Sequence, residues 1–231
     1  MKALMKSSER DKSTTTMQEF IAKMGEARKV LQSTSSHVSV RSGCELFVRF
    51  ITLSQPELEQ ASDFGMCRNI LLSRGQSFIE KMEWSRETLV EKTQKLIKDD
   101  MVILTHARSR NVLAAMLKAS HRGTQFKVYV TEAQPNCEGR RMAEELSKHN
   151  IPATVILDSA VGYIMRKVDV VLLGAEGVCE NGGIINRIGT CNVSTMANLS
   201  NKPVYVLVES FKFLRLIPLN NSSLPKEYLF H

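Results

Sequence analysis

Long hydrophobic runs are missing from this sequence of 231 residues. It has no apolar stretch of about 20 residues, the length that a membrane-spanning helix needs. Its N-terminus is rich in Lys, Ser and Thr and lacks the apolar segment of a signal peptide. Because 43% of the residues are hydrophobic, the chain can still bury a proper core. We therefore expect a soluble, cytosolic protein without a membrane partner.

Cysteine pairs and base-stacking aromatics are also lacking. The five cysteines form no C-x-x-C pair, and no histidine lies at the spacing of a zinc ligand, so we expect reduced thiols and no metal site. Aromatic residues make up only 6% and do not alternate with Arg or Lys. The net charge of +7 is dispersed along the chain. These features argue against direct contact with nucleic acid.

Three motifs of common enzyme classes are absent. There is no G-x-x-x-x-G-K-[ST], no G-x-S-x-G, and no G-x-G-x-x-G after the first expected strand. Their absence argues against a nucleotide hydrolase, a serine hydrolase and a dinucleotide-dependent oxidoreductase, and no cofactor is expected.

Helical periodicity dominates the first 99 residues. Apolar residues recur at helical spacing over residues 17–31. Ser42 and Glu45 form a capping box that predicts the start of a second helix. A third helix is expected over residues 64–82, and a fourth over 85–98 with Ser85 as its N-cap. We expect an N-terminal helical domain, residues 1–99.

From residue 100 the pattern changes to short strands that alternate with helices. This alternation predicts a Rossmann-like α/β domain over residues 100–231, with a mainly parallel sheet and helices on both faces. The expected strands are 101–106, 126–131, 153–157, 168–173 and 204–208, and the expected helices are 109–120, 138–149, 160–167 and 191–200.

The stretch 168–190 contains the most distinctive pattern of this second half. Its apolar first part predicts a strand buried on both faces, and the small residues from Gly174 to Gly183 allow close approach to a ligand. The alternative is a glycine-rich loop that only turns the chain.

Polar side chains follow every expected strand. Because the carboxyl ends of parallel strands meet at one edge, they should form a ligand crevice. Carboxylates there suit sugar hydroxyls and cations suit phosphate. Taken singly, Asp158 is better explained as a helix N-cap or a surface charge, Lys212 as a solvated side chain, and His106 as a hydrogen-bonded structural residue. The candidate ligand residues are Thr105, His106, Arg108, Glu132, Arg141, Asp158, Glu176 and Lys212.

Several of these segments resemble the translation initiation factor 2B alpha/beta/delta family. The similar segments are V-Y-V-T-E-A-Q-P-N-C-E-G-R-R-M-A-E-E-L (128–146), V-I-L-D-S-A-V-G-Y-I-M (155–165), G-A-E-G-V-C-E-N-G-G-I-I-N-R-I-G-T (174–190) and V-E-S-F-K-F (208–213). Residues 38–51 and 103–110 resemble the alpha subunit in particular. The resemblance implies a helical N-terminal domain followed by a Rossmann-like domain, and it implies that the C-terminal domain is truncated here.

The same resemblance extends to sugar-phosphate isomerases that share this fold. Where they have a catalytic Cys after the first strand, this chain has Ala107; their catalytic Asp corresponds to Glu176, and their phosphate-binding Arg to Gln134. Alanine supplies neither thiolate nor acid. The resemblance retains Glu132, Asn186 and Lys212, and so adds Asn186 to the candidate ligand residues. It implies binding of a sugar phosphate or nucleoside monophosphate without turnover.

The resemblance thus implies a non-catalytic regulatory subunit of the guanine-nucleotide exchange complex for initiation factor 2. The expected partners are the beta and delta subunits of initiation factor 2B, a second copy of this chain, and initiation factor 2 with its alpha subunit phosphorylated. The alternative is a sugar-phosphate aldose-ketose isomerase whose chemistry has moved to Glu176 and His106, or to Cys137 or Cys179.

Overall fold

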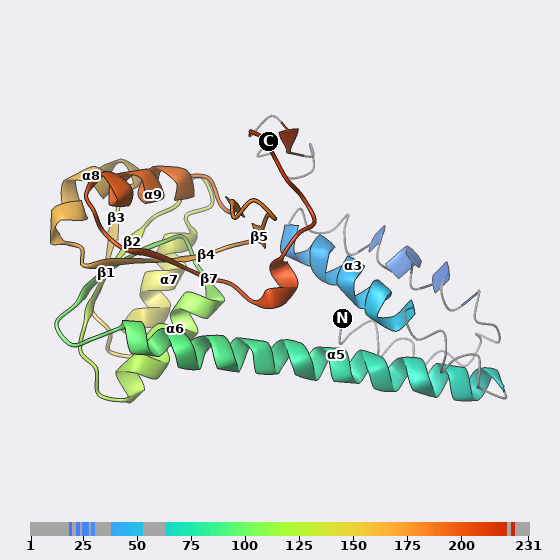
Figure 1. Cartoon of the computed structure of the whole chain (residues 1–231). Coiled ribbons are helices and arrows are strands. Elements are labelled where there is room, and N and C mark those ends of the chain that lie inside the picture. The colour runs from blue at the N-terminus through green and yellow to red at the C-terminus, as the bar shows by residue number, and fades with distance from the viewer. Residues whose placement is uncertain are drawn as a thin grey trace.

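A computed structural model of the protein describes residues 19, 22–23, 25–27, 29–30, 38–52, 63–220 and 223–224. Figure 1 shows a helical part beside an α/β part, with one long helix, α5, running beneath both. The elements are α3 (Val38–Thr52), α5 (Phe64–Thr93), η1 (Gln94–Leu96), β1 (Val102–His106), α6 (Arg110–His121), β2 (Lys127–Thr131), α7 (Glu138–Ser147), β3 (Ala153–Ile156), η2 (Asp158–Ala160), α8 (Val161–Ile164), η3 (Met165–Lys167), β4 (Val170–Gly174), β5 (Gly177–Val178), β6 (Ile184–Ile185), α9 (Thr190–Leu199), β7 (Val204–Leu207) and η4 (Ser210–Lys212).

The α/β part is the predicted Rossmann-like domain. Its five strands are all parallel, in the order β3-β2-β1-β4-β7. Every residue of β4 is buried, which agrees with its unbroken apolar sequence. One core cluster packs α6 and α7 against one face of the sheet, and a second packs α8 and α9 against the other. The predicted α/β fold class is therefore confirmed.

The helical part has a small core of its own. α3 packs against α5, where Phe47 and Phe78 meet edge to face with ring centroids 5.4 Å apart. Further along, α5 packs on α6, and Leu89 and Ile97 join the core of the α/β part. The long helix thus belongs to both cores. The boundary at residue 99 stays a prediction, and most of the helix expected over 17–31 lies outside the described residues.

Two predicted helix boundaries are wrong. Ser42 is not an N-cap, because α3 already begins at Val38 and the buried Ser42 hydroxyl donates to the Phe211 carbonyl at 3.3 Å. Ser85 starts no new helix either. No proline or glycine interrupts the chain there, and α5 continues through it from its cap at Asp63, whose carboxylate accepts from the Met66 amide at 2.7 Å.

A small hairpin follows β4 and was not predicted. β5 and β6 pair antiparallel across a turn in which the Cys179 amide donates to Gly183 at 2.8 Å and Gly182 has a φ of 82°. The chain after η4 then runs beside β5, where the Leu214 amide donates to Val178 at 2.7 Å. This arrangement brings the C-terminal segment back to the end of the sheet that carries the expected ligand residues.

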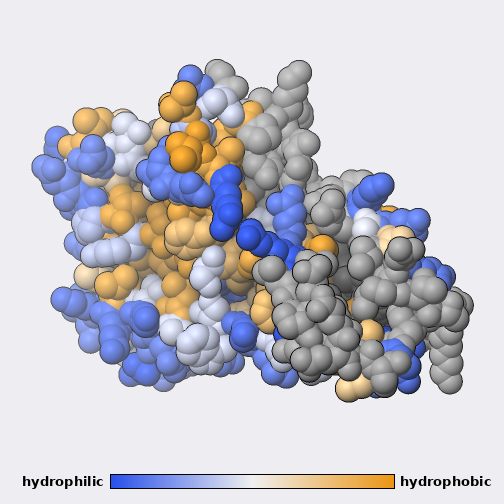
Figure 2. All heavy atoms as spheres, turned by 45° about the vertical axis from the view of Figure 1, so that its right-hand side comes forward, coloured by the Kyte–Doolittle hydropathy of each residue, from blue (hydrophilic) through white to orange (hydrophobic). Residues whose placement is uncertain are grey.

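Both outer strands of the sheet expose apolar side chains, Val155 and Tyr205 among them. Figure 2 shows one face of the molecule, on which apolar residues gather over the α/β part and hydrophilic residues surround them. None of the helices in the described part is long and apolar enough to cross a membrane.

Candidate ligand pocket at the strand ends

A cavity of about 250 Å³ opens where β1 and β4 end. Five of the nine candidate residues line it: His106, Arg108, Glu176, Asn186 and Lys212. They come from four separate stretches of chain that only the parallel sheet brings together. The lining also includes residues that were not on the candidate list: Ala107, Ser109, Arg110, Asn111, Glu138, Gly174, Ala175, Arg187 and Glu209.

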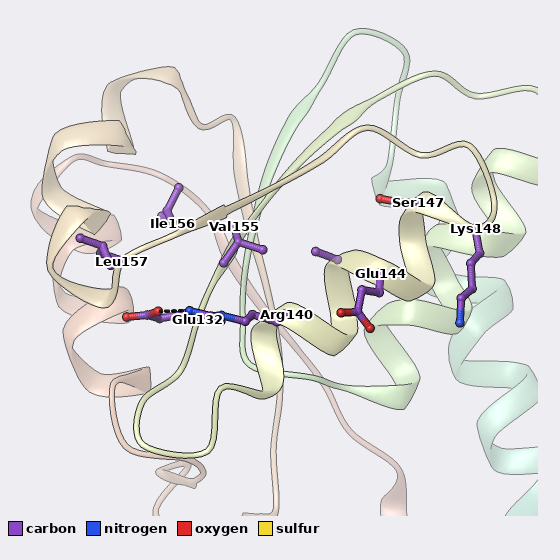
Figure 3. A pocket seen from close by; sticks show the side chains of 9 residues that line it. Glu132, Arg140, Glu144, Ser147, Lys148, Val155, Ile156 and Leu157 are labelled. Atoms are coloured by element: carbon purple, nitrogen blue, oxygen red, sulfur yellow. Dashed lines mark ion pairs between the residues drawn. The ribbon is translucent and has the colours of Figure 1, made fainter.

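The other four candidates lie elsewhere. Thr105 is fully buried in β1, and its hydroxyl has no hydrogen-bond partner in the described part of the chain. The Asp158 carboxylate accepts from the Ala133 and Gln134 amides at 3.0 and 2.9 Å. The Asp158 side chain therefore fixes the backbone of the loop after β2. This role is closer to that of a helix cap than to that of a ligand-binding residue. Arg141 is exposed on α7, and Glu132 lines a different groove (Figure 3).

His106 is held rigidly on both sides of its ring. Nδ1 lies 2.6 Å from the Thr131 hydroxyl, and Nε2 lies 2.7 Å from the Ile188 carbonyl. A carbonyl only accepts, so Nε2 carries the proton and Nδ1 accepts from the hydroxyl in the neutral ring. Burial lowers the pKa of His106 below its ordinary value of 6.5. Both ring nitrogens are engaged, which supports the structural interpretation of this histidine.

The free energy of unfolding should therefore depend on pH through His106. A lowered folded-state pKa means that the unfolded chain takes up the proton first as the pH falls. The contribution of the neutral His106 ring to the free energy of unfolding is therefore fully present above about pH 6.5 and is lost as the pH falls below it. Urea unfolding at pH 7.5 and 5.5 should show a larger loss for wild type than for His106→Gln, whose amide donates and accepts at similar places. Equal losses would contradict a neutral, buried ring.

Asn186 closes the cavity from the loop between β6 and α9. Its amide donates to the Gly174 carbonyl at 2.9 Å and to the Thr190 hydroxyl at 3.1 Å. Gly174 leaves no room for a side chain, since a Cβ there would lie 2.5 Å from the Ser109 hydroxyl oxygen. These contacts set the shape of the cavity floor.

A buried carboxylate anchors the opposite wall. Glu209, whose side chain is 1% exposed, accepts from Asn111 at 2.7 Å and pairs with Lys212 at 3.2 Å. Arg86 of α5 reaches the same carboxylate at 3.3 Å. Burial alone raises the pKa of Glu209, but the charge of Lys212 and the hydrogen bond from Asn111 outweigh it, and the pKa is held below its ordinary value. The long helix is thereby tied to the cavity wall.

The cations of the cavity differ in how strongly they are already paired. Arg108 donates to Glu145 at 2.9 to 3.1 Å, and these hydrogen bonds raise its pKa. Arg187 pairs with Glu138 at 3.5 Å. Arg110, in contrast, is exposed, and none of the described residues forms an ion pair with it. Lys212 pairs with Glu209 and also donates to the Ala175 carbonyl at 2.9 Å, so it is held at the cavity wall. Among these cations Arg110 is therefore the one best placed for a phosphate.

No cysteine is among the residues that line the cavity. The position after His106 is Ala107, which is buried and has a φ of 56°. Cys137 lies outside, at the start of α7. Cys179 lies in the hairpin region, and burial raises the pKa of its thiol. A nucleophilic thiolate therefore cannot be assigned to this cavity.

Glu138 and Arg187 could have been found from the sequence. Glu138 begins the helix after the second strand, and residues at such helix starts share the edge where the strands end. Arg187 lies in the glycine-rich stretch 168–190 itself. Asn111, the second residue of α6, has the same helix-start signal, but its pairing with the buried Glu209 could not be read from the sequence. No group of three or more metal-ligating side chains occurs among the described residues.

Fold and cavity together define a Rossmann-like protein with a polar pocket at its strand ends, lined by both cations and carboxylates, and a helical N-terminal part. The chain belongs to the initiation factor 2 subunit family, whose model matches residues 1–228.

Relatives fall into two groups. The chain is 40% identical over 215 residues to translation initiation factor eIF2B subunit alpha of Caenorhabditis elegans, covering 93% of this chain and 70% of that protein. It is 30% identical over 212 residues to ribose 1,5-bisphosphate isomerase of Thermococcus kodakarensis, covering 91% of this chain and 65% of that protein.

Solved structures show the same fold. Translation initiation factor eIF-2B of Pyrococcus horikoshii OT3 superposes with a TM-score of 0.67 at 26% identity, covering 91% of this chain and 78% of the other. The tetrameric eIF2B-beta2-delta2 complex of C. thermophilum contains a chain that superposes with a TM-score of 0.76 at 16% identity, covering 98% of this chain and 78% of the other.

Proposed function

We propose that this protein is a regulatory subunit of the exchange complex for initiation factor 2 and acts in the cytosol without catalysing a reaction itself. The alpha-subunit relatives at 40% identity support this function. The single observation that carries the non-catalytic part is Ala107, which places a methyl group at the strand end where the resemblance to the isomerases implies a catalytic thiol.

The proposed partners are the beta and delta subunits, a second copy of this chain, and initiation factor 2 carrying a phosphorylated alpha subunit. The 40% identity to eIF2B alpha subunits supports the partnership with the other eIF2B subunits. The experiment is to add the tagged chain to the purified beta and delta subunits and measure the native mass. A complex containing all three is expected, and capture should then be tested with phosphorylated and unphosphorylated initiation factor 2. Failure of both subunits to bind would overturn the proposal.

We also propose that the cavity binds a sugar phosphate or a nucleoside monophosphate. Carboxylates of Glu138 and Glu176 suit sugar hydroxyls, while Arg110 and Lys212 suit the phosphate. A ligand at a hundredfold excess over its Kd stabilises the folded state by about 2.7 kcal/mol. Ribose 5-phosphate and a nucleoside monophosphate are the probes.

A thermal-shift series tests this binding. We expect at least one probe at millimolar concentration to raise the melting temperature of wild type, and Lys212→Ala and Arg110→Ala to reduce the rise. Each variant is compared with itself without ligand, because Lys212→Ala also removes the pair with Glu209. Lys118→Ala, in α6 beside Glu91 of α5 and not among the residues that line the cavity, should keep the full rise. An equal rise in all four proteins would place the ligand elsewhere, and no rise would mean that the cavity does not bind these compounds.

The isomerase alternative deserves a direct test because isomerases are among the relatives at 30% identity. Incubation with ribose 1,5-bisphosphate, followed by NMR for the ketose, should show no turnover. Turnover that Glu176→Gln abolishes would establish the isomerase function.

A further inference from the structure

The outer edge of β3 carries unpaired backbone groups. The Val128 amide donates to the Pro152 carbonyl, and the Glu132 amide donates to the Ile156 carbonyl, both at 2.9 Å. Residues 152 and 156 therefore face β2. Since direction alternates along a strand, the backbone groups of Ala153 and Val155 face outward. Within the described part of the chain, no hydrogen bond reaches the Val155 amide or carbonyl.

A groove of about 850 Å³ runs along this edge, between β3 and α7. Figure 3 shows its lining, with Val155 from the strand and Glu144 from the helix among the labelled side chains. Val155 is 38% exposed and Leu157 60%. Residues 151–157 contain no charged residue that would discourage another strand from pairing. This edge is thus both open and apolar.

One side of α7 borders the groove with charges that alternate in sign. Arg140, Glu144 and Lys148 follow at intervals of four residues, and all three line it. Arg140 pairs with Glu132 at 3.9 Å, but its side chain is 66% exposed and remains available. At a rise of about 1.5 Å per residue, Arg140 and Lys148 lie about 12 Å apart along the helix. Two residues four apart on a β-strand are separated by about 13 Å, which matches that spacing.

The order of the charges along α7 distinguishes two kinds of strand that could pair with β3: β3 of a second copy of this chain, or a segment of a different protein. In a twofold pairing of β3 with β3 of a second copy, the two α7 helices would lie antiparallel. Arg140 would then face Lys148 of the other copy, and the two Glu144 side chains would face each other. Like charges at such positions oppose pairing. A different chain with acid, base and acid at alternate positions would meet an opposite charge at each point.

We propose that this groove binds an extended segment of another protein, which adds as a strand to β3. Backbone hydrogen bonds to the outward groups of residues 153 and 155 supply its alignment. Its groove-facing side chains are acidic, basic and acidic in turn, with aliphatic stems over Val155 and Leu157 and charged ends on Arg140, Glu144 and Lys148. This site is separate from the strand-end cavity and does not depend on the function proposed above.

The test uses two blocked heptapeptides with the full chain labelled with ¹⁵N. The probe is Ac-Thr-Glu-Val-Lys-Val-Glu-Thr-NH2, and its control, Ac-Thr-Lys-Val-Glu-Val-Lys-Thr-NH2, exchanges the charges. We expect the probe to shift amide signals of β3 and α7 and to bind at least tenfold more tightly than the control. The double variant Arg140→Glu, Lys148→Glu should reverse this preference. Lys167→Glu, which changes an exposed cation outside the groove, should leave the preference unchanged.

Four outcomes would overturn the proposal. The first is the absence of shifts at millimolar probe, and the second is equal binding of both peptides. The third is a concentration-dependent dimer that Val155→Glu dissociates, which would make a second copy the occupant. Shifts confined to the opposite edge, at Tyr205 and its neighbours, would likewise assign strand addition to β7 and not to β3.

Discussion

A Glu209→Ala variant is expected to be less stable than wild type by about 3–5 kcal/mol, the range for removing one partner from a buried ionic network. Its carboxylate is almost fully enclosed and joins Lys212, Asn111 and Arg86. Without it, the Lys212 ammonium stays largely buried, and the Asn111 amide keeps only its longer hydrogen bond to the Leu207 carbonyl, at 3.3 Å. The cost is therefore mainly that of uncompensated polar groups, and urea unfolding at pH 7.5 measures it.

A matched ion pair provides the control. Glu91 and Lys118 lie 3.2 Å apart, as do Glu209 and Lys212, but the former pair is exposed. Glu91→Ala should change stability by no more than about 1 kcal/mol. Because the pKa of Glu209 is lowered in the folded state, its stabilisation is present above its ordinary value of 4.5 and is lost as the pH falls through the folded-state pKa. Similar losses in both variants at pH 7.5 would contradict a buried network.

The sheet was predictable because its signals are local. Each strand is a short apolar run bounded by polar residues, and β4 is buried on both faces along its whole length. Parallel pairing then follows from the helices between the strands, and the common edge follows from parallel pairing. The cavity could therefore be placed from sequence, as could His106 and Lys212 within it.

Contacts between distant segments were not predictable. Ser42 has the spacing of a helix cap, but its hydroxyl donates a hydrogen bond to the carbonyl of Phe211, which lies 169 residues away in the sequence. Thr105 and Asp158 follow the strand-end pattern, yet the Thr105 side chain is fully buried and the Asp158 carboxylate holds a neighbouring loop. Sequence position locates a residue at the edge, whereas the side-chain direction depends on the finished packing.

The hairpin β5–β6 had a local signal, Asn181-Gly182-Gly183, that favours a tight turn.

Gly139→Ala is expected to be among the most damaging single substitutions in the α/β part. Gly139 is the second residue of α7, and its amide donates to the Glu132 carbonyl at 3.1 Å. A Cβ there would lie 1.9 Å from the Thr131 carbonyl oxygen and 2.9 Å from the Glu132 Cα. These are backbone atoms of β2 and its end, so no side chain can rotate away. Either α7 or the end of β2 must move, at a cost of roughly 3 kcal/mol or more.

The effect should reach the cavity as well as stability. Movement of α7 would displace Glu138, which begins the helix and pairs with Arg187 across the cavity. Gly162→Ala in α8 is the control, since its Cβ would meet only the Met196 sulfur at 3.4 Å, and it should remain within about 1 kcal/mol of wild type. Urea unfolding and the thermal shift with ribose 5-phosphate measure the two effects. If Gly139→Ala were as stable as Gly162→Ala, the close approach of α7 to β2 would be wrong, and with it the position of Glu138 at the cavity.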